Sequence, residues 1–202
     1  MFGELLRSKL AGICELSEWQ IERLRLHYEL LTRWNKVLSL TSVRTVEEAV
    51  ERHYCESVFA ACYLPEGGVS VADVGSGAGF PGIPIGIMRP ACSVVLIESH
   101  QRKAAFLKEA SRELGNVRVV ARRVEDVTEG FDWVVSRAVR YSDIAGSLKK
   151  LGRNAELLTG GVRAEDLSGF EWQEPIRVPW GERRYLWIGR NLTGSVVQAR
   201  FT

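Results

Sequence analysis

One stretch of this sequence, residues 71–82, constrains the fold more than any other. It reads V-A-D-V-G-S-G-A-G-F-P-G, so four glycines fall within eight positions after an apolar run. The residues that follow, 83–88, are mostly apolar and can form a buried helix. Glycines allow a ligand to approach the backbone closely, and Pro81 suits the first position of a helix. The stretch therefore predicts a strand, a glycine turn and a helix N-terminus, which together form a nucleotide-type site.

The glycines alone are compatible with two kinds of cofactor. Residues 77–82 satisfy G-x-G-x-x-G, the dinucleotide fingerprint. Residues 73–79 also satisfy D-x-G-x-G-x-G, the first motif of S-adenosylmethionine (SAM) methyltransferases. Because similar glycine clusters also occur in plain turns, the rest of the chain has to decide between these interpretations.

Composition excludes several classes of protein. The 202 residues suit one domain with a small extension, and no apolar run approaches the ~20 residues of a membrane span. The N-terminus has no signal-peptide pattern, which predicts a cytoplasmic protein. The net charge is only +2, and the positive residues occur in local clusters. The four cysteines show no C-x-x-C spacing and there are three histidines, so we expect no metal site.

The first 66 residues read as helices. Residues 4–14 have a short helical pattern, and Ser17 with Gln20 forms a capping box for a long helix ending near Leu38. A second capping box at residues 45–48 opens a helix that runs to about Tyr63. We expect residues 1–66 to form a helical extension packed on a core of residues 67–202, because these apolar stripes must be buried somewhere.

From residue 69 onward, strand and helix patterns alternate. The predicted strands are 69–74, 93–98, 116–120, 131–136 and 155–159, the later helices are 102–114 and 144–151, and residues 176–178 and 184–188 form an antiparallel hairpin. Alternating elements predict an α/β fold with a mostly parallel, Rossmann-like sheet between helices.

In such a sheet, ligands bind outside the C-terminal ends of the strands. Glu98 follows the second strand, sixteen residues beyond Gly82, at a spacing suited to an acid that bonds ribose hydroxyls. Glu125 or Asp126, or the backbone beside them, is a candidate for the adenine edge. Both NAD and SAM carry a ribose, so Glu98 does not separate them.

Two further motifs resemble one family. Residues 31–44 are similar to its helical W-N-K…N-L-T-x-x-R segment, and residues 52–57 resemble its R-H-x-x-D-S. Residues 73–84 match D-x-G-[ST]-G-x-G-[FL]-P-G-[IL]-P, whose F-P-G-I-P part is far more specific than the glycines. The sequence resembles, over residues 20–190, the glucose-inhibited division protein B (RsmG) family of SAM-dependent methyltransferases. These enzymes act on N7 of a guanine in 16S ribosomal RNA.

The resemblance implies a class I SAM methyltransferase with a mostly parallel seven-stranded sheet, an antiparallel C-terminal hairpin and an N-terminal helical cap. It places SAM contacts at Asp73, Gly75, Gly77, Phe80, Glu98, Val124, Glu125 and Arg137. The chain departs from the family pattern at Glu56 for Asp, at Ser39 for Asn, and at Thr159 for a lysine that can touch RNA. The tail after Asn191 has no clear counterpart in the family.

The implied mechanism needs no general base, because guanine N7 carries a lone pair and no proton. Catalysis is then mainly positioning, and we expect Arg137 to help place the guanine or the methionine carboxylate. Candidate phosphate contacts are Arg44, His53, Lys103, Arg123 and Arg140. For His53, a place in the core or at the interface with the helical cap is an equal alternative.

The expected partner is 16S ribosomal RNA or the small ribosomal subunit, with the protein acting as a monomer and without a membrane. Two alternatives remain open. A nicotinamide-dependent oxidoreductase could use the same G-x-G-x-x-G, although no acid/base residue such as Tyr-Lys or His is obvious near the fourth or fifth strand. A module that binds SAM or RNA without turnover would share the same motifs.

Overall fold

The structure is a computed structural model that describes residues 1–137, 139–160 and 168–193. Ala138 and Gly161, which belong to two of the family-like segments, and residues 194–202 of the tail lie outside these ranges. Within the described ranges, no helix has the length and apolarity needed to cross a membrane.

The N-terminal segment is helical, as predicted, but its helices have different bounds. It comprises α1 (Phe2–Leu10), α2 (Glu18–Trp34), α3 (Val46–Ala49), a π-helix η1 (Val50–Cys55) and α4 (Glu56–Tyr63). The Ser17 capping box is present. The second box is only half formed, because Glu48 accepts a hydrogen bond from the Arg44 amide and not from Thr45.

Two helix predictions in this segment were wrong in detail. Helix α2 ends at Trp34 and not near Leu38, because Asn35 caps it and its side-chain oxygen accepts the amides of Leu40 and Thr41. The predicted continuous helix to Tyr63 contains the π-helix η1, which periodicity alone does not reveal. Wider helical turns of this kind often occur at functional sites.

The remaining elements alternate as predicted, and two short ones, Phe170–Trp172 and Val124–Asp126, were not among the predicted elements. The strands are β1 (Ser70–Val74), β2 (Ser93–Ile97), β3 (Val117–Val120), β4 (Phe131–Arg137), β5 (Gly152–Gly160), β6 (Phe170–Trp172), β7 (Ile176–Arg177) and β8 (Arg184–Asn191). The helices among them are α5 (Gly82–Met88), α6 (Gln101–Ala110), the short 3-10 helix η2 (Val124–Asp126) and α7 (Tyr141–Leu151). Pro81 is the N-cap of α5 and not its first residue.

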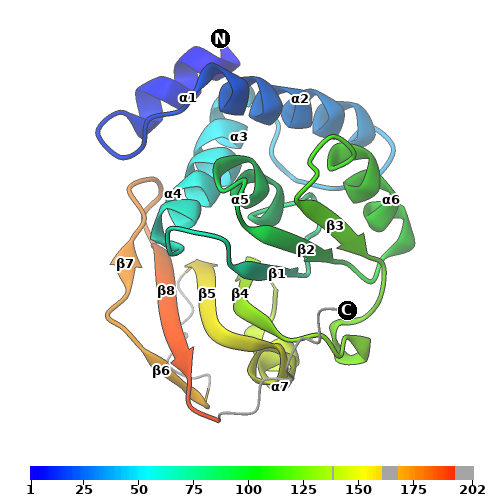
Figure 1. Ribbon diagram of the computed structural model, residues 1–202. Helices are drawn as coiled ribbons and strands as arrows, with labels where there is room; N and C mark the ends of the chain where they lie inside the picture. Colours follow the sequence, from blue (N-terminus) through cyan, green and yellow to red (C-terminus); the bar gives the residue numbers. More distant parts are fainter. Residues whose placement is uncertain (138, 161–167, 194–202) are drawn as a thin grey trace.

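The strands form one sheet in the order β3-β2-β1-β4-β5-β8-β6, and β7 also pairs with β8 (Figure 1). Strands β1 to β5 are parallel, and β8 runs antiparallel to β5. The prediction of seven strands was wrong in number, since the described residues form an eight-stranded sheet. Strands β6 and β7 pair with different ends of β8, so they share one lateral position.

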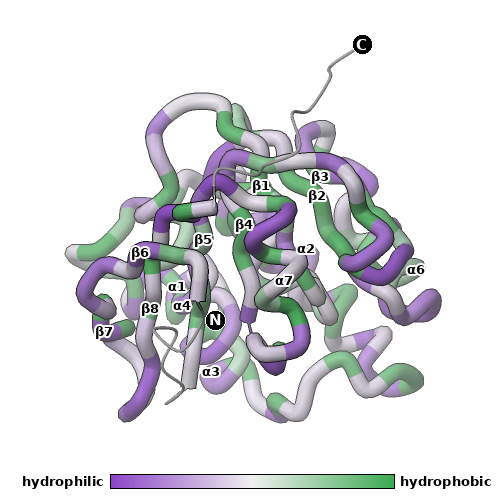
Figure 2. Tube along the Cα trace, turned by 90° about the horizontal axis from the view of Figure 1, so that it is seen from below, coloured by the Kyte–Doolittle hydropathy of each residue, from purple (hydrophilic) through white to green (hydrophobic). Residues whose placement is uncertain are grey.

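Alternate residues of each strand face two separate apolar layers. Val71 and Leu96 pack in the layer that contains α1, α2, α4, α5 and α6. Ala72 and Ile97 pack in the layer that contains α7. Helices α1 to α5 lie together in Figure 1, and Figure 2 shows hydrophobic stretches in the central strands. This two-sided burial explains why these strands read as nearly continuous apolar runs.

One buried side chain on β5 does not fit this apolar pattern. Glu156 is 2% exposed, and neither of its carboxyl oxygens has a hydrogen-bond partner among the described residues. Burial raises the pKa of this carboxyl well above its ordinary range. Burial therefore favours the neutral acid of Glu156 in the folded protein, whereas the unfolded chain ionises it near its ordinary pKa of ~4.3.

The raised pKa of Glu156 determines how this residue changes the free energy of unfolding with pH. Because the folded state keeps a proton that the unfolded state loses, this group contributes stability below pH ~4.3 that is lost as pH rises. We expect Glu156→Gln to gain stability relative to the wild type between pH 5 and pH 8, by up to ~1.4 kcal/mol per pH unit. Urea unfolding at both pH values measures this, and exposed Glu174→Gln is the control. Parallel profiles for Glu156→Gln and the wild type would contradict the prediction.

Candidate functional site

The backbone between β1 and α5 turns tightly at the C-terminal ends of the strands. The amides of Gly75 and Ser76 both donate to the carbonyl oxygen of Ile97, at 3.0 and 3.1 Å. Gly79 has a φ of 87°, and a Cβ there would lie 2.5 Å from Ile83 Cδ1. Only glycine adopts this conformation readily and leaves the space free. The turn is thus fixed by its neighbours as well as by its own sequence.

Asp73 supports the turn from beneath. Its Oδ2 accepts a hydrogen bond from the Gly82 amide at 3.0 Å, at the start of α5. The side chain is completely buried, and burial raises the pKa of Asp73 to about 7. A Cβ on Gly82 would lie 2.6 Å from Asp73 Oδ2 and 2.3 Å from Leu96 Cδ2. The acid of the D-x-G-x-G-x-G motif therefore acts as a structural support of the turn.

A buried histidine holds the turn from the side of the N-terminal helices. His27 on α2 lies 3.1 Å from the carbonyl oxygen of Ala78 through Nε2, and 2.9 Å from the Tyr54 hydroxyl through Nδ1. Burial lowers the pKa of His27 to about 4, so the ring is neutral at pH 7. Neutral imidazole has one donor and one acceptor, so Tyr54 donates to Nδ1 and Nε2–H donates to Ala78. The helical segment thereby fixes the carbonyl orientation within the glycine turn.

Glu98 lies at the other side of the turn, immediately after β2. Its Oε2 accepts the Gly77 amide at 3.0 Å, and its Oε1 accepts the His100 amide at 2.8 Å. The residue is 8% exposed. Each carboxylate oxygen has a second lone pair, so Glu98 can accept further hydrogen bonds from ligand hydroxyls.

Two cavities meet at this edge of the sheet. The central cavity has a volume of about 400 Å³ and is lined by Leu40, Thr41, His53, Gly75, Ser76, Gly77, Ala78, Phe80, Glu98, Lys103, Arg137 and Val139. The side cavity has about 190 Å³ and is lined by Val74, Gly75, Ile97, Glu98, Ser99, Arg122, Arg123, Val124, Glu125, Val139 and Ile144. Gly75, Glu98 and Val139 line both, so the two cavities adjoin across these residues.

The end of β4 brings a buried arginine into the central cavity. The Arg137 side chain is 9% exposed, and its Nε lies 3.5 Å from Oε2 of Glu56 on α4. Arg184 on β8 binds the other oxygen of Glu56 at 3.0 Å. Burial raises the pKa of Glu56, although both arginines oppose this by favouring its charged form. The cluster joins the helical segment to two strands of the sheet.

His53, on the π-helix η1, lies between this arginine and the glycine turn. Its ring stacks on Phe80 with centroids 4.7 Å apart, and Arg137 Nη2 lies 2.8 Å from its Nδ1. Its Nε2 lies 2.7 Å from Thr41 Oγ1. Burial and the adjacent Arg137 charge lower the pKa of His53 to about 3. The ring is therefore neutral at physiological pH, and both of its nitrogens are engaged.

Comparison with known proteins assigns this arrangement to a family. A family model described as "rRNA small subunit methyltransferase G" matches residues 20–159, which include η1, the glycine turn and the ends of β2 and β4. The chain belongs to the GidB family. It is 43% identical over 141 residues to the curated "Ribosomal RNA small subunit methyltransferase G" of Nitrosospira multiformis. The alignment covers 68% of this chain and 63% of that relative's length.

Another curated relative agrees with this assignment, and solved structures share the fold. The protein of the same description from Methylobacillus flagellatus is 42% identical over 149 residues, covering 72% of this chain and 67% of the relative. A ribosomal protein L11 methylase of Lactobacillus delbrueckii has a TM-score of 0.56 at 17% identity, covering 67% of this chain and 77% of that structure. M. capricolum TrmK, solved with S-adenosyl-homocysteine, has a TM-score of 0.55 at 11% identity, with coverages of 70% and 69%. The structural likeness shows the class I SAM methyltransferase fold.

Most residues that the GidB resemblance singled out converge on the two cavities. Gly75, Gly77, Phe80, Glu98, Arg137, His53 and Lys103 line the central cavity, and Val124, Glu125 and Arg123 line the side cavity. Asp73 lines neither, since it is buried beneath the turn. Arg140 is the exposed N-cap of α7 and also lines neither.

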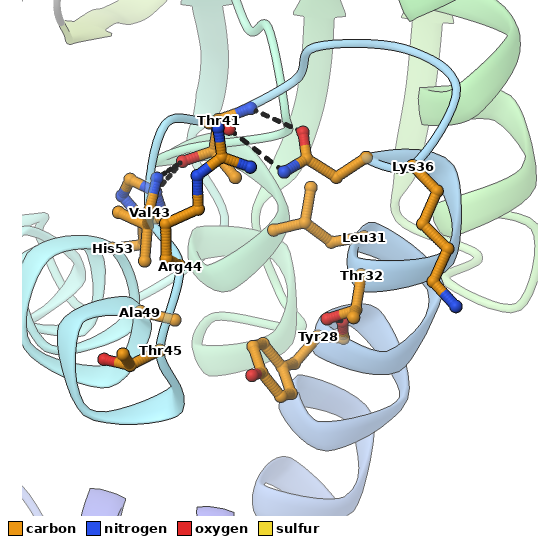
Figure 3. A pocket seen from close by; sticks show the side chains of 11 residues that line it. Tyr28, Leu31, Thr32, Lys36, Thr41, Val43, Arg44, Thr45, Ala49 and His53 are labelled. Carbon is orange, nitrogen blue, oxygen red and sulfur yellow. Dashed lines mark hydrogen bonds between the residues drawn. The ribbon is translucent and has the colours of Figure 1, made fainter.

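Arg44 lies in a third pocket next to the central cavity. This groove of about 220 Å³ runs between α2 and residues 41–45, and it shares Thr41 and His53 with the central cavity. Figure 3 shows Arg44 beside these two residues, whereas the Lys36 side chain points away from them. Among the predicted RNA contacts, Arg44 is therefore near the site and exposed.

Sequence reasoning missed several residues that shape the site. Thr41 lines the cavity, His27 fixes Ala78, and Arg184 binds Glu56. His27 lies three residues after Leu24, on the apolar stripe of α2, and a polar residue on such a stripe was the available signal. Arg184 had no such signal, because its partner lies more than a hundred positions earlier in the chain.

The tight packing beneath the turn yields a prediction for Gly82. We expect Gly82→Ala to lower the free energy of unfolding by about 1–3 kcal/mol, because the new methyl group must displace Leu96 or the Asp73 carboxylate. Chemical denaturation measures this change. Gly115→Ala is the matched control, since a Cβ there meets nothing within 4 Å. Equal stabilities of the two variants would show that the packing at Gly82 is not tight.

Proposed function

We propose that this protein transfers a methyl group from SAM to N7 of a guanine in 16S ribosomal RNA. The observation that carries the proposal is the convergence of the GidB motif residues on one pair of adjoining cavities at the strand ends. The curated relatives are named for methylation of small-subunit ribosomal RNA. The guanine and its N7 position come from the family resemblance.

The chemistry of the donor set fits SAM. Glu98 borders both cavities and has free lone pairs for ribose hydroxyls. The side cavity has apolar walls from Val74, Ile97 and Val124, which suit an adenine ring. Arg137 Nη1 is buried without a hydrogen-bond partner among the described residues, so a carboxylate such as that of the methionine group would satisfy it.

When bound, SAM supplies a methyl group on a positively charged sulfur. The nucleophile, guanine N7, has a lone pair and no proton to remove, so the protein has only to bind and orient the two reactants. The histidine in the central cavity agrees with this. His53 is neutral and both nitrogens are already engaged, so it is not poised as a general base. Arg137, its neighbour, is held as a fixed donor.

On the RNA side, we infer phosphate contacts from Arg44, Lys103, Arg123 and Arg140. Lys103 and Arg123 border the two cavities, Arg44 lines the adjoining groove, and Arg140 is exposed after β4. His53 is no longer among these candidates, because a neutral, engaged ring offers a phosphate no positive charge. Thr159 is buried, so the position where the family has a lysine presents no charge to RNA. The monomeric state and the cytoplasmic location remain predictions.

Two experiments test the proposed function in sequence. Calorimetry should detect binding of SAM, or of its demethylated product, and no comparable binding of NAD. The protein is then incubated with SAM and with small subunits, or naked 16S RNA, from a strain that lacks the gene. Mass mapping of the RNA should find one guanine that gains a methyl group. Binding of NAD instead of SAM would favour an oxidoreductase, and SAM binding without transfer to either substrate would favour a non-catalytic module.

The proposed phosphate contacts are tested through salt. Each lysine or arginine that contacts a phosphate should contribute about 0.7–0.9 to the slope of log affinity against log salt. We expect Lys103→Ala and Arg123→Ala each to reduce this slope by about that amount in equilibrium binding to the RNA. Arg190→Ala, an exposed position on β8 that pairs with Glu171, is the control and should leave the slope unchanged. An unchanged slope for Lys103→Ala would remove it from the RNA interface.

A further inference from the structure

A chain of three side chains ends in the central cavity, and its direction can be worked out from the hydrogen-bonding capacity of each group. Arg137 Nη2 lies 2.8 Å from His53 Nδ1, and His53 Nε2 lies 2.7 Å from Thr41 Oγ1. A guanidinium has donors only, so Nδ1 of His53 must be the acceptor and carries no proton. The Arg52 carbonyl oxygen, 3.1 Å from the same Nδ1, is an acceptor and would favour a proton there. The charged Arg137 donor is closer, at 2.8 Å, and cannot donate to an Nδ1 that carries a proton, so it decides the assignment.

The tautomer of His53 then fixes the role of Thr41. A neutral ring without a proton on Nδ1 carries it on Nε2, which donates to Thr41 Oγ1. The same oxygen also accepts the Val43 amide at 3.1 Å. A hydroxyl has two lone pairs and one proton, so both lone pairs are filled and Thr41 can only donate. No acceptor for this proton is found among the residues that the structure describes.

Thr41 is also held in place. Its amide donates to Asn35 Oδ1 and its carbonyl oxygen accepts from Asn35 Nδ2, both at 3.0 Å. Figure 3 shows Thr41 and His53 joined at one end of the groove, and both also line the central cavity. Thr41 is therefore a fixed donor without an acceptor, beside the cavity that also contains Glu98 and the glycine turn.

Guanine and adenine differ in what they present next to N7. Guanine has the O6 acceptor there, whereas adenine has the N6 amino group, which is a donor. A hydroxyl that can only donate would pair with O6 and would oppose N6–H₂. We propose that the Thr41 hydroxyl donates to O6 of the target guanine, so that it selects guanine over adenine and holds N7 in position for methyl transfer. This inference rests on the proposed function and names the residue that determines its base specificity.

The tautomer is tested without any substrate. In protein labelled with ¹⁵N-histidine, the ring nitrogens of His53 should report a neutral ring protonated at Nε2 from pH 7 down to about pH 4, and His53→Gln assigns the signals. A ring protonated at Nδ1, or a charged ring at pH 7, would overturn the proposal whatever the enzyme does.

The preference for guanine is tested by a double-mutant cycle. Its two changes, one in the protein and one in the RNA, should remove the same hydrogen bond. One is Thr41→Val, and the other is 2-aminopurine, which lacks O6, in place of the mapped target guanine. We expect each change alone to lower kcat/KM roughly 10- to 100-fold, and the two together to lower it little further. Thr41→Ser should retain the activity, and SAM affinity should be the same in all variants.

Thr128→Val is the control, because Thr128 is an exposed threonine that lines neither the two cavities nor the adjoining groove. It should behave like the wild type. Independent, multiplicative effects of Thr41→Val and 2-aminopurine, or full activity of Thr41→Val on guanine, would overturn the role of Thr41 while leaving the proposed function intact. If the wild type methylates no RNA although the NMR shows the Nε2 tautomer, the proposed function fails, and the assignment to guanine O6 fails with it.

Discussion

The structure depends most on how closely the turn after β1 approaches its neighbours. The backbone of residues 75–82 passes so near to Leu96, Ile83 and Asp73 that side chains at Gly79 and Gly82 would overlap them. Asp73 supports the turn from beneath, His27 fixes one of its carbonyls, and Glu98 binds one of its amides. The cavities exist because this backbone is held in one conformation from three sides. A ligand can then meet amides and a carboxylate that are already oriented.

The second constraint is a set of charged groups buried between the helical segment and the sheet. Removing Glu56 and Arg137 from water is costly, and the cost is offset because Glu56 pairs with both Arg137 and Arg184. The same arginine charge, together with burial, keeps His53 neutral. Electrostatics thus determines the protonation state of His53. From the sequence this histidine could carry a positive charge, but in the structure its ring is neutral and lies between Arg137 and Thr41.

These features agree with a reaction that needs orientation more than proton transfer. A nucleophile that already has a free lone pair gains nothing from a base. It does gain from donors and acceptors that fix the angle and distance of approach. The central cavity is lined by such groups, and we propose that Glu98 and Arg137 bind the methyl donor and that Thr41 binds the base. The neighbouring groove, which contains Arg44, shares Thr41 and His53 with the central cavity and so extends it.

The sequence by itself determined the order of strands and helices, the glycine turn and the family. Each of these follows from local patterns. These are the apolar periodicity of about two residues in strands and 3.6 in helices, the spacing of the glycines, and the F-P-G-I-P sequence after them. Helix ends were less certain, because the side chain of Asn35, which folds back on residues 40 and 41, ends α2 earlier than periodicity indicates. The division of the last sheet position between β6 and β7 depends on pairing with β8, which no local pattern specifies.

Only the tertiary structure decided what the polar residues of the site do. Asp73, which the sequence singles out beside the glycines, is buried beneath the turn, and His53 lies between Arg137 and Thr41. Glu56 and Arg184 lie more than a hundred residues apart in sequence and form one ion pair. The physical reason is common to all of them. Protonation state and hydrogen-bond direction depend on desolvation and on partners from distant parts of the chain. The spacing of residues in the sequence predicts neither the desolvation nor these partners.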